Sequence, residues 1–269
     1  MAADFALVDA LKATLAAHGD AARAVPMQAY MKSALPFHGV ATPLRRQLVA
    51  RAAAAWAPAD TATVSDTVLA LWRSATHREA RYAALDLLRL PRLRRRLSTA
   101  LLPALQEMIE TGAWWDFCDE ISGVALARLL QAEPAVIKPV LRRWANGPSM
   151  WLRRAAMLSQ RSLKSGFDAV LFYDTLLPSL AGGAFADEFF IRKGMGWALR
   201  ERAYAAPDEV RAFCTEYAER LSPLTKREAL RVIGYRTSSA APASRAHRAA
   251  PAAPPGPGRA RRPRRAASR

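Results

Sequence analysis

The chain has 269 residues, of which 51% are hydrophobic, and its formal net charge is +17. This length is enough for one sizeable core or for a short array of stacked repeats. No stretch of about 18 uncharged apolar residues is present, so the sequence predicts no membrane-spanning helix. The charge favours a polyanionic partner, with nucleic acid ahead of a membrane surface.

The pattern of the chain predicts an all-α protein. Ala and Leu dominate long segments without Gly or Pro, and alternating β-branched segments are almost absent. The first half predicts helices over 4–18, 25–35, 44–56, 60–73, 78–90 and 98–110. The second half predicts helices over 116–131, 134–145, 149–164, 167–180, 186–204, 207–220 and 222–235. Helix pairs that recur about every 35–45 residues are typical of tandem α-α repeats. We therefore expect an α-α superhelix, a curved solenoid whose concave face binds the partner.

The composition changes after Arg236. Residues 237–269 are rich in Arg, Pro and Ala, with eight arginines and no acidic residue, so residues 1–236 keep a net charge of +9. Such a tail buries too little apolar surface to fold, and we expect it to be disordered. Its arginines could help to hold nucleic acid, or the tail could be a dispensable solvated extension. The predicted domains are thus a helical-repeat domain over 1–236 and a basic tail over 237–269.

Several kinds of site lack support in the sequence. The four histidines are scattered, the two cysteines (Cys118 and Cys214) match no zinc or disulfide spacing, and no phosphate-cradling glycine loop is present. We therefore expect neither a metal nor a cofactor, and two reduced thiols near buried faces. Acidic residues at 4 and 9 make the N-terminus unlike a secretory signal, so we expect a soluble protein of the cytoplasm.

The most informative stretch is 111–123 in the middle of the chain. At helical spacing, Trp114, Phe117 and Ile121 form an apolar stripe that would face a core. Trp115 and Asp119 share another face, one turn apart. Acidic residues at a helix start favour the positive end of the helix dipole, which is the structural explanation for Asp119. It does not explain the neighbouring indole, so a carboxylate beside an indole in a basic protein indicates a site for a cation.

A second unusual face lies in the helix predicted over 186–204. Lys193, Trp197, Arg200 and Tyr204 align on one side, and this mixture of aromatic and basic residues is typical of contacts with sugar-phosphate and bases. The alternative is a Trp packed at a helix–helix edge with cations around it. Gly194 and Gly196 would each cost about 1 kcal/mol relative to Ala, so they indicate the close approach of a neighbouring helix or of a ligand.

A third unusual stretch is Trp151–Gln160. Leu152, Ala155 and Ala156 would face inward, whereas two arginines, Arg153 and Arg154, stand near the helix start, where the helix dipole disfavours them. A bound phosphate would explain these arginines, and a solvated charged face is the alternative.

Over about residues 5–235 the chain resembles the AlkD-type DNA glycosylases, HEAT-like-repeat proteins of DNA alkylation repair. The motifs that carry the resemblance occur in the order of that family. They are Met27-Gln28-Ala29-Tyr30-Met31-Lys32, Pro36-Phe37-His38-Gly39-Val40, Pro43-Leu44-Arg45-Arg46, Trp114-Trp115-Asp116-Phe117-Cys118-Asp119, Trp151-Leu152-Arg153-Arg154-Ala155, Asp187 to Lys193, and Gly196-Trp197-Ala198-Leu199-Arg200.

The resemblance implies excision of purines alkylated at ring nitrogens, chiefly 3-methyladenine and 7-methylguanine, from double-stranded DNA without base flipping. It implies that Asp119 is the catalytic carboxylate, that Trp115 and Trp197 contact the deoxyribose, and that Arg154, in preference to Arg153, assists at the backbone. It places further DNA contacts at Tyr30, Lys32, Phe37, Arg45, Arg46, Arg153, Lys193 and Arg200. The expected enzyme is a monomer without a cofactor.

The residue types suit this chemistry. N-alkylation makes the purine a cationic leaving group, so no strong general acid is needed. Loss of the base builds positive charge on the sugar, as in other glycoside cleavages. A fixed carboxylate such as Asp119 stabilises that charge, and indole faces add cation–π attraction. Two other classes of function stay open, a non-catalytic DNA-binding relative and a helical scaffold that binds protein, of which the basic charge disfavours the scaffold.

Overall fold

The computed structural model describes residues 2–93, 97–163 and 165–233. In the first half the α-helices are α1 (Phe5–Ala17), α2 (Ala21–Met31), α3 (Thr42–Ala52), α4 (Thr61–Arg73), α5 (Arg78–Arg89) and α6 (Leu102–Gly112). In the second half they are α7 (Trp115–Ile121), α8 (Ala127–Ala132), α9 (Pro134–Asn146), α10 (Met150–Leu158), α11 (Ala169–Leu176), α12 (Phe189–Ala203), α13 (Pro207–Glu216) and α14 (Pro223–Leu230). The prediction of an all-α superhelical solenoid is confirmed, and the described residues contain no strand.

Local sequence fixes most of the helix starts. The side chain of the capping residue accepts a hydrogen bond from a first-turn amide at Asp4, Asp20, Asp60, Ser149, Asp168 and Ser222. Each such cap contributes about 1 kcal/mol relative to Ala. Proline stands at the first or second position of α3, α6, α9, α13 and α14, where its missing amide costs nothing. The breaks in the sequence therefore predict most boundaries correctly.

Several helices are shorter than their predicted ranges or shifted from them, and two of these show the physical reason. The helix expected over 25–35 is α2, Ala21–Met31, because Asp20 caps it early and Lys32 ends it in the left-handed conformation (φ 49°). The helix expected over 149–164 ends at Leu158 in α10. The side chain of Gln160 turns instead to the backbone of Asp168, donating to its carbonyl oxygen at 2.9 Å and accepting from its amide at 2.7 Å. The residues after Leu158 therefore form a turn.

The helix expected over 116–131 is continuous, but its middle is wound differently. Between α7 and α8, residues Ser122–Leu126 form a turn of π-helix. Such wider turns are rare and occur frequently at functional sites. This one begins three residues after Asp119.

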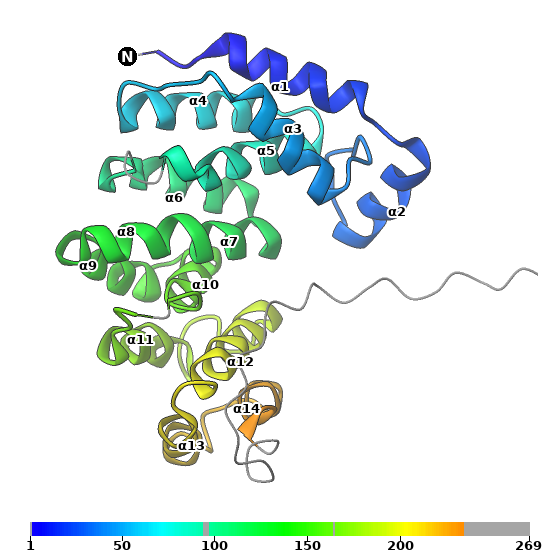
Figure 1. Cartoon of the computed structure of the whole chain (residues 1–269). Coiled ribbons are helices and arrows are strands. Elements are labelled where there is room, and N and C mark those ends of the chain that lie inside the picture. The colour runs from blue at the N-terminus through cyan, green and yellow to red at the C-terminus, as the bar shows by residue number, and fades with distance from the viewer. Residues whose placement is uncertain (1, 94–96, 164, 234–269) are drawn as a thin grey trace, which may run out of the picture.

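The helices pack in two layers (Figure 1). One layer, which we call the site layer, is formed by α3, α5, α7, α10, α12 and α14, each packed against the next. Helices α4, α6, α9, α11 and α13 form the other layer, and α4–α5, α6–α7, α9–α10 and α12–α13 are packed pairs that join the two. The site layer brings together helices that are not neighbours in the chain.

Two apolar clusters form the core. The larger extends from Leu7 to Leu171, and the second surrounds α12 from Met157 to Ile233. Both cysteines are free and buried, as predicted. Among the described residues no helix has the length and apolar character needed to cross a membrane. The predicted basic tail, 237–269, lies outside the described residues.

Candidate active site

The site is organised around Asp119, which projects from α7 toward α10. Its side chain is almost fully buried, and the residue is 8% exposed. The Arg154 guanidinium of α10 donates two parallel hydrogen bonds to it, Nε to Oδ1 at 2.8 Å and Nη2 to Oδ2 at 2.9 Å. This bidentate geometry is the strongest form of the arginine–carboxylate pair. The two residues that the sequence placed in one site are therefore in direct contact.

A glycine on the next helix makes room for this pair. A Cβ on Gly194 of α12 would lie 2.7 Å from Nη1 of Arg154. The same Nη1 donates to the carbonyl oxygen of Phe190, at the start of α12. The expectation that Gly194 permits a close approach is confirmed, and the group that approaches it is the Arg154 side chain.

Burial and charge act on Asp119 in opposite directions. Burial raises the pKa of Asp119 above its ordinary value, and the charge and hydrogen bonds of Arg154 and the nearby charge of Arg161 offset this only in part. Each carboxylate oxygen has a second lone pair beyond the one that Arg154 uses. The carboxylate can therefore stay paired with Arg154 and still face a developing positive charge.

The two tryptophans predicted for the site lie on either side of this pair along the chain. Trp115 is the first residue of α7, one turn before Asp119, and is half-buried. Trp197 lies on α12, also half-buried, and its Nε1 donates to Glu201 at 2.9 Å. The Arg161 guanidinium links Trp197 to Asp119, because it stacks 4.2 Å from the Trp197 ring and donates to the Asp119 carbonyl oxygen at 3.1 Å.

Two of the predicted DNA-binding cations are already paired within the protein. Lys193 and Arg200 both donate to Glu228 of α14, each at 2.6 Å. Gly196 allows this approach, since a Cβ there would lie 2.6 Å from Cβ of Glu228. Burial would raise the pKa of Glu228, but the bonds from Lys193 and Arg200 outweigh it and hold that pKa below its usual value. Any phosphate that binds here competes with Glu228.

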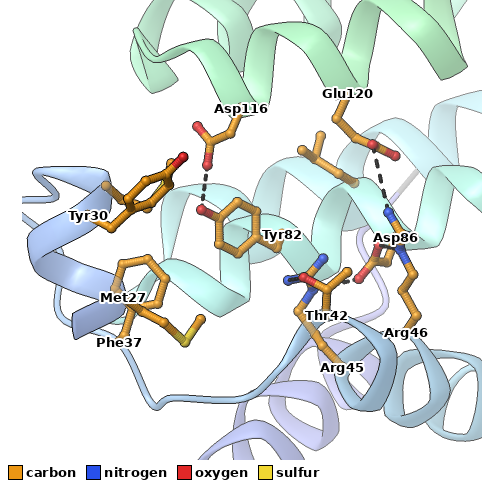
Figure 2. A pocket seen from close by; sticks show the side chains of 12 residues that line it. Met27, Tyr30, Phe37, Thr42, Arg45, Arg46, Tyr82, Asp86, Asp116 and Glu120 are labelled. Atoms are coloured by element: carbon orange, nitrogen blue, oxygen red, sulfur yellow. Dashed lines mark hydrogen bonds and ion pairs between the residues drawn. The ribbon is translucent and has the colours of Figure 1, made fainter. Parts of the chain in front are cut away.

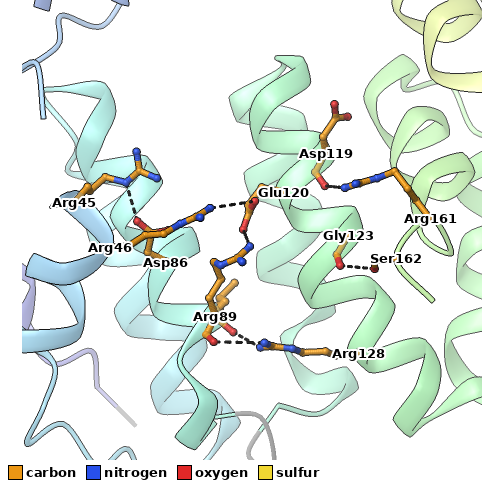
Figure 3. Close-up of polar contacts among 11 residues, drawn as sticks. Arg45, Arg46, Asp86, Arg89, Asp119, Glu120, Gly123, Arg128, Arg161 and Ser162 are labelled. Carbon is orange, nitrogen blue, oxygen red and sulfur yellow. Dashed lines mark hydrogen bonds and ion pairs between the residues drawn. The ribbon is translucent and has the colours of Figure 1, made fainter. Parts of the chain in front are cut away.

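Arg45 and Arg46 enter a second ionic group, between α3, α5 and α7 (Figure 3). Arg45 is buried and donates to Asp86 at 2.7 Å. Arg46 is more exposed and bridges Asp86, at 3.2 Å, and Glu120, at 3.9 Å. Burial argues against a direct phosphate contact by Arg45, whereas Arg46 keeps an accessible guanidinium.

The motif residues of α2 border a cavity of about 290 Å³ between α2, α3, α5 and α7 (Figure 2). Tyr30 is 75% exposed at its rim, and Lys32 is exposed just beyond α2. Phe37 is only 6% exposed and also lines the cavity. Its burial leaves little of the Phe37 side chain for DNA to reach, and a DNA contact by Phe37 stays a prediction.

Arg153 and Arg154 have different surroundings. Arg153 is buried, and its Nε donates to the carbonyl oxygen of Gly147 at 2.7 Å. A second bond reaches the carbonyl oxygen of Pro178 at 3.4 Å. The prediction of Arg153 as a DNA contact is not supported by this arrangement, because its guanidinium ties backbone segments together. Arg154 is the one that meets Asp119.

Two groups at the site were not predicted from the sequence. One is Arg161, which the predicted helix over 149–164 would put on the same side as Arg154, although the structure places it in the turn after α10. The other is the partly buried cluster of Arg78, Tyr82 and Asp116, in which Arg78 donates to Asp116 at 2.8 Å and the Tyr82 hydroxyl donates to the same carboxylate. Burial and the Asp116 charge raise the pKa of Tyr82. This cluster fixes the start of α7 against α5.

The fold and the site define a class of protein, an α-α solenoid with a buried Asp–Arg pair on one helical layer, joined through Arg161 to an indole. Residues 11–233 match the model of the DNA alkylation repair enzyme family, and the chain belongs to this family. It is similar to a solved structure described as a predicted DNA alkylation repair enzyme from Enterococcus faecalis, with 26% identity, a TM-score of 0.68, and coverage of 79% of this chain and 95% of that one. A search of curated proteins found no match. The resemblance inferred from the motifs is thus confirmed, together with a role in DNA alkylation repair.

Proposed function

We propose that the protein is a monofunctional DNA glycosylase that hydrolyses the N-glycosidic bond of cationic N-alkylpurines, such as 3-methyladenine and 7-methylguanine, in duplex DNA without base flipping. The observation that carries the proposal is the buried Asp119–Arg154 pair, with Arg161 joining Asp119 to Trp197. Membership of the DNA alkylation repair enzyme family supports a DNA substrate.

The chemistry follows from charge. The bond between C1′ and the purine nitrogen breaks, and its electron pair leaves with the base and neutralises the alkylated ring. The sugar becomes an oxocarbenium ion, which Asp119 stabilises through space. Water then adds to C1′ and gives up its proton, for which Asp119 is the nearest candidate base. The half-buried indoles of Trp115 and Trp197 offer faces that attract the cationic sugar.

We place the DNA backbone on the site layer. Tyr30, Lys32 and Arg46 are accessible on the α2–α3 side. Lys193 and Arg200 lie on α12, where phosphates would replace Glu228. Such contacts position the duplex on the protein but do not read its base sequence.

The test is release of free base from randomly methylated duplex DNA, followed by chromatography. We expect the wild-type protein to release 7-methylguanine. The rate of release should be about 10²–10³-fold lower in Asp119→Asn, which is the effect of removing one electrostatic stabiliser. Asp174→Asn is the matched control, because Asp174 forms a partly exposed ion pair with Arg142 at 2.7 Å, on α11 and α9 of the other layer. An Asp119→Asn rate equal to that of wild type would remove Asp119 from the mechanism.

One observation favours a second candidate, a DNA-binding protein without catalysis. Both oxygens of Asp119 are bonded to Arg154, which is also the arrangement of a purely structural ion pair. Salt-dependent binding to duplex DNA with no release of base from any alkylated substrate would support this candidate.

A further inference from the structure

Arg161 contacts both a main-chain atom of Asp119 and the ring of Trp197. It lies in the turn after α10, and its Nη2 donates to the Asp119 carbonyl oxygen at 3.1 Å, as Figure 3 shows. Its Cζ stacks 4.2 Å from the centre of the Trp197 ring. One planar group thus spans the interval between α7 and α12, the two helices that supply the proposed carboxylate and the proposed indole.

The π-helical turn after α7 leaves a space that the Arg161 guanidinium fills. Gly123 lies in the π-helical turn, and a Cβ at this position would be 2.4 Å from Nη2 of Arg161. The hydroxyl of Ser162, the next residue, donates to the Gly123 carbonyl oxygen at 2.7 Å. The wider turn and the missing side chain therefore admit the guanidinium against α7.

Burying the charge of Arg161 costs free energy that an apolar side chain filling the same space would not. The Arg161 side chain is largely buried, and burial lowers its pKa. Its Nε is buried and has no hydrogen-bond partner among the described residues. A well-packed apolar side chain commonly stabilises such a position better than a buried charge. The cation therefore calls for an explanation beyond packing.

We propose that Arg161 is a positioning residue that holds the Trp197 indole in register with Asp119, so that the sugar of the damaged nucleotide meets both. The proposal rests on the proposed glycosylase activity. Arg161 covers one face of the indole, and Glu201 fixes its edge through Nε1 at 2.9 Å. With these two contacts the ring cannot turn freely, and its remaining surface is left for the substrate.

This role predicts an effect on the chemical step. A misplacement of about 1 Å in a reacting group can cost about 10²-fold in rate, whereas duplex binding depends on phosphate contacts elsewhere. In the full-length protein we expect Arg161→Met to lower kcat for release of 7-methylguanine by about 10-fold or more, with KM changed less than about 3-fold, the signature of an interaction made in the transition state. Arg161→Lys, which keeps a cation over the ring, should recover part of the rate.

A double-mutant cycle separates positioning from general damage. If Arg161 acts through Trp197, Arg161→Met should have little further effect in a Trp197→Ala background. Arg202→Met is the matched control, because Arg202 also stacks 4.2 Å from an aromatic ring, that of Phe167, and pairs with Glu209. The control should keep the wild-type kcat.

Gly123→Ala is the independent variant, because it displaces the guanidinium and leaves Arg161 in the chain. It should lower kcat in the same way, with thermal unfolding showing an intact fold. Two outcomes would overturn the positioning role alone, given a wild-type protein that releases base. One is an unchanged kcat in Arg161→Met, and the other is additive losses of kcat in the Arg161→Met, Trp197→Ala double mutant. A wild type that frees no base would overturn the proposed function, and the positioning role with it.

Discussion

The Arg154 guanidinium occupies the space in which a Cβ on Gly194 would lie, with Nη1 2.7 Å from that position. Gly194→Ala should therefore move Arg154 away from Asp119 and lower base release by about 10²-fold, the scale of a misplaced catalytic group. Stability should fall by less than the about 3–5 kcal/mol of a fully broken buried pair, since Arg154 stays in the chain and Ala gains about 1 kcal/mol over Gly in helix propensity. Base release and thermal unfolding, measured together, check the two parts.

Gly196→Ala gives the contrast on the same helix. Its Cβ would meet Cβ of Glu228 at 2.6 Å and the carbonyl oxygen of Thr225 at 3.0 Å, both on α14. Because backbone on α14 would have to shift, this variant should lower the unfolding temperature. A stable Gly196→Ala variant would show that α12 and α14 separate easily.

The second prediction concerns the Asp119–Arg154 pair. Arg154→Met leaves Asp119 buried without its partner, and breaking a buried pair in this way costs about 3–5 kcal/mol. Adding Asp119→Asn should restore much of that stability, because the uncompensated charge is then gone. Denaturant unfolding of the single and double variants measures the coupling. Losses that simply add would mean that the two side chains do not interact.

The third prediction concerns Glu228, which holds two cations of the proposed DNA surface. Glu228→Gln frees Lys193 and Arg200 to bind phosphates, so the affinity for DNA should rise. The slope of log affinity against log salt concentration should steepen by the amount expected for about one or two additional phosphate contacts. Fluorescence anisotropy across a salt series measures both quantities. Glu107→Gln, which breaks the exposed pair with Arg73, is the control and should change neither the affinity nor the slope.

The fourth prediction concerns pH. His38 stacks on His77 with ring centres 3.7 Å apart, and burial, together with the His77 charge, lowers the pKa of His38. The unfolded chain therefore takes up a proton near the ordinary histidine pKa of about 6.5, while folded His38 resists it. Its contribution to stability is present above about pH 6.5 and is lost as the pH falls toward the lowered folded value.

Replacing His38 by Asn should reduce the change in the free energy of unfolding over this pH range. Chemical denaturation between pH 7.5 and 5.5, ~1 unit either side of the ordinary histidine pKa, measures it. The exposed His18 serves as the control, and His18→Asn should leave the slope as in wild type. A slope that survives His38→Asn would assign the proton uptake to another group.

Much of the fold follows from sequence because capping residues, prolines and apolar spacing act over a few positions. Asp4, Asp60 and Pro134 set helix starts at the predicted places, and the stripe of Phe117 and Ile121 is buried as its spacing requires. The sequence could not show that α10 stops at Leu158, because the bonds of Gln160 to Asp168 that redirect the chain form only in the folded turn.

The candidate site, like the fold, has features that the sequence predicts and others that depend on tertiary packing. The sequence by itself indicated which residues would carry the proposed chemistry, since Asp119, Trp115, Trp197 and Arg154 stood out by type, spacing and resemblance. Only the tertiary structure decided that Arg154 rather than Arg153 meets Asp119, that Arg45 is buried in an ion pair, and that Arg161 joins α7 to α12. The physical reason is distance along the chain. Spacing reports neighbours within one helix, whereas these partners come from different helices, and the stacking of the layers sets which side chains meet.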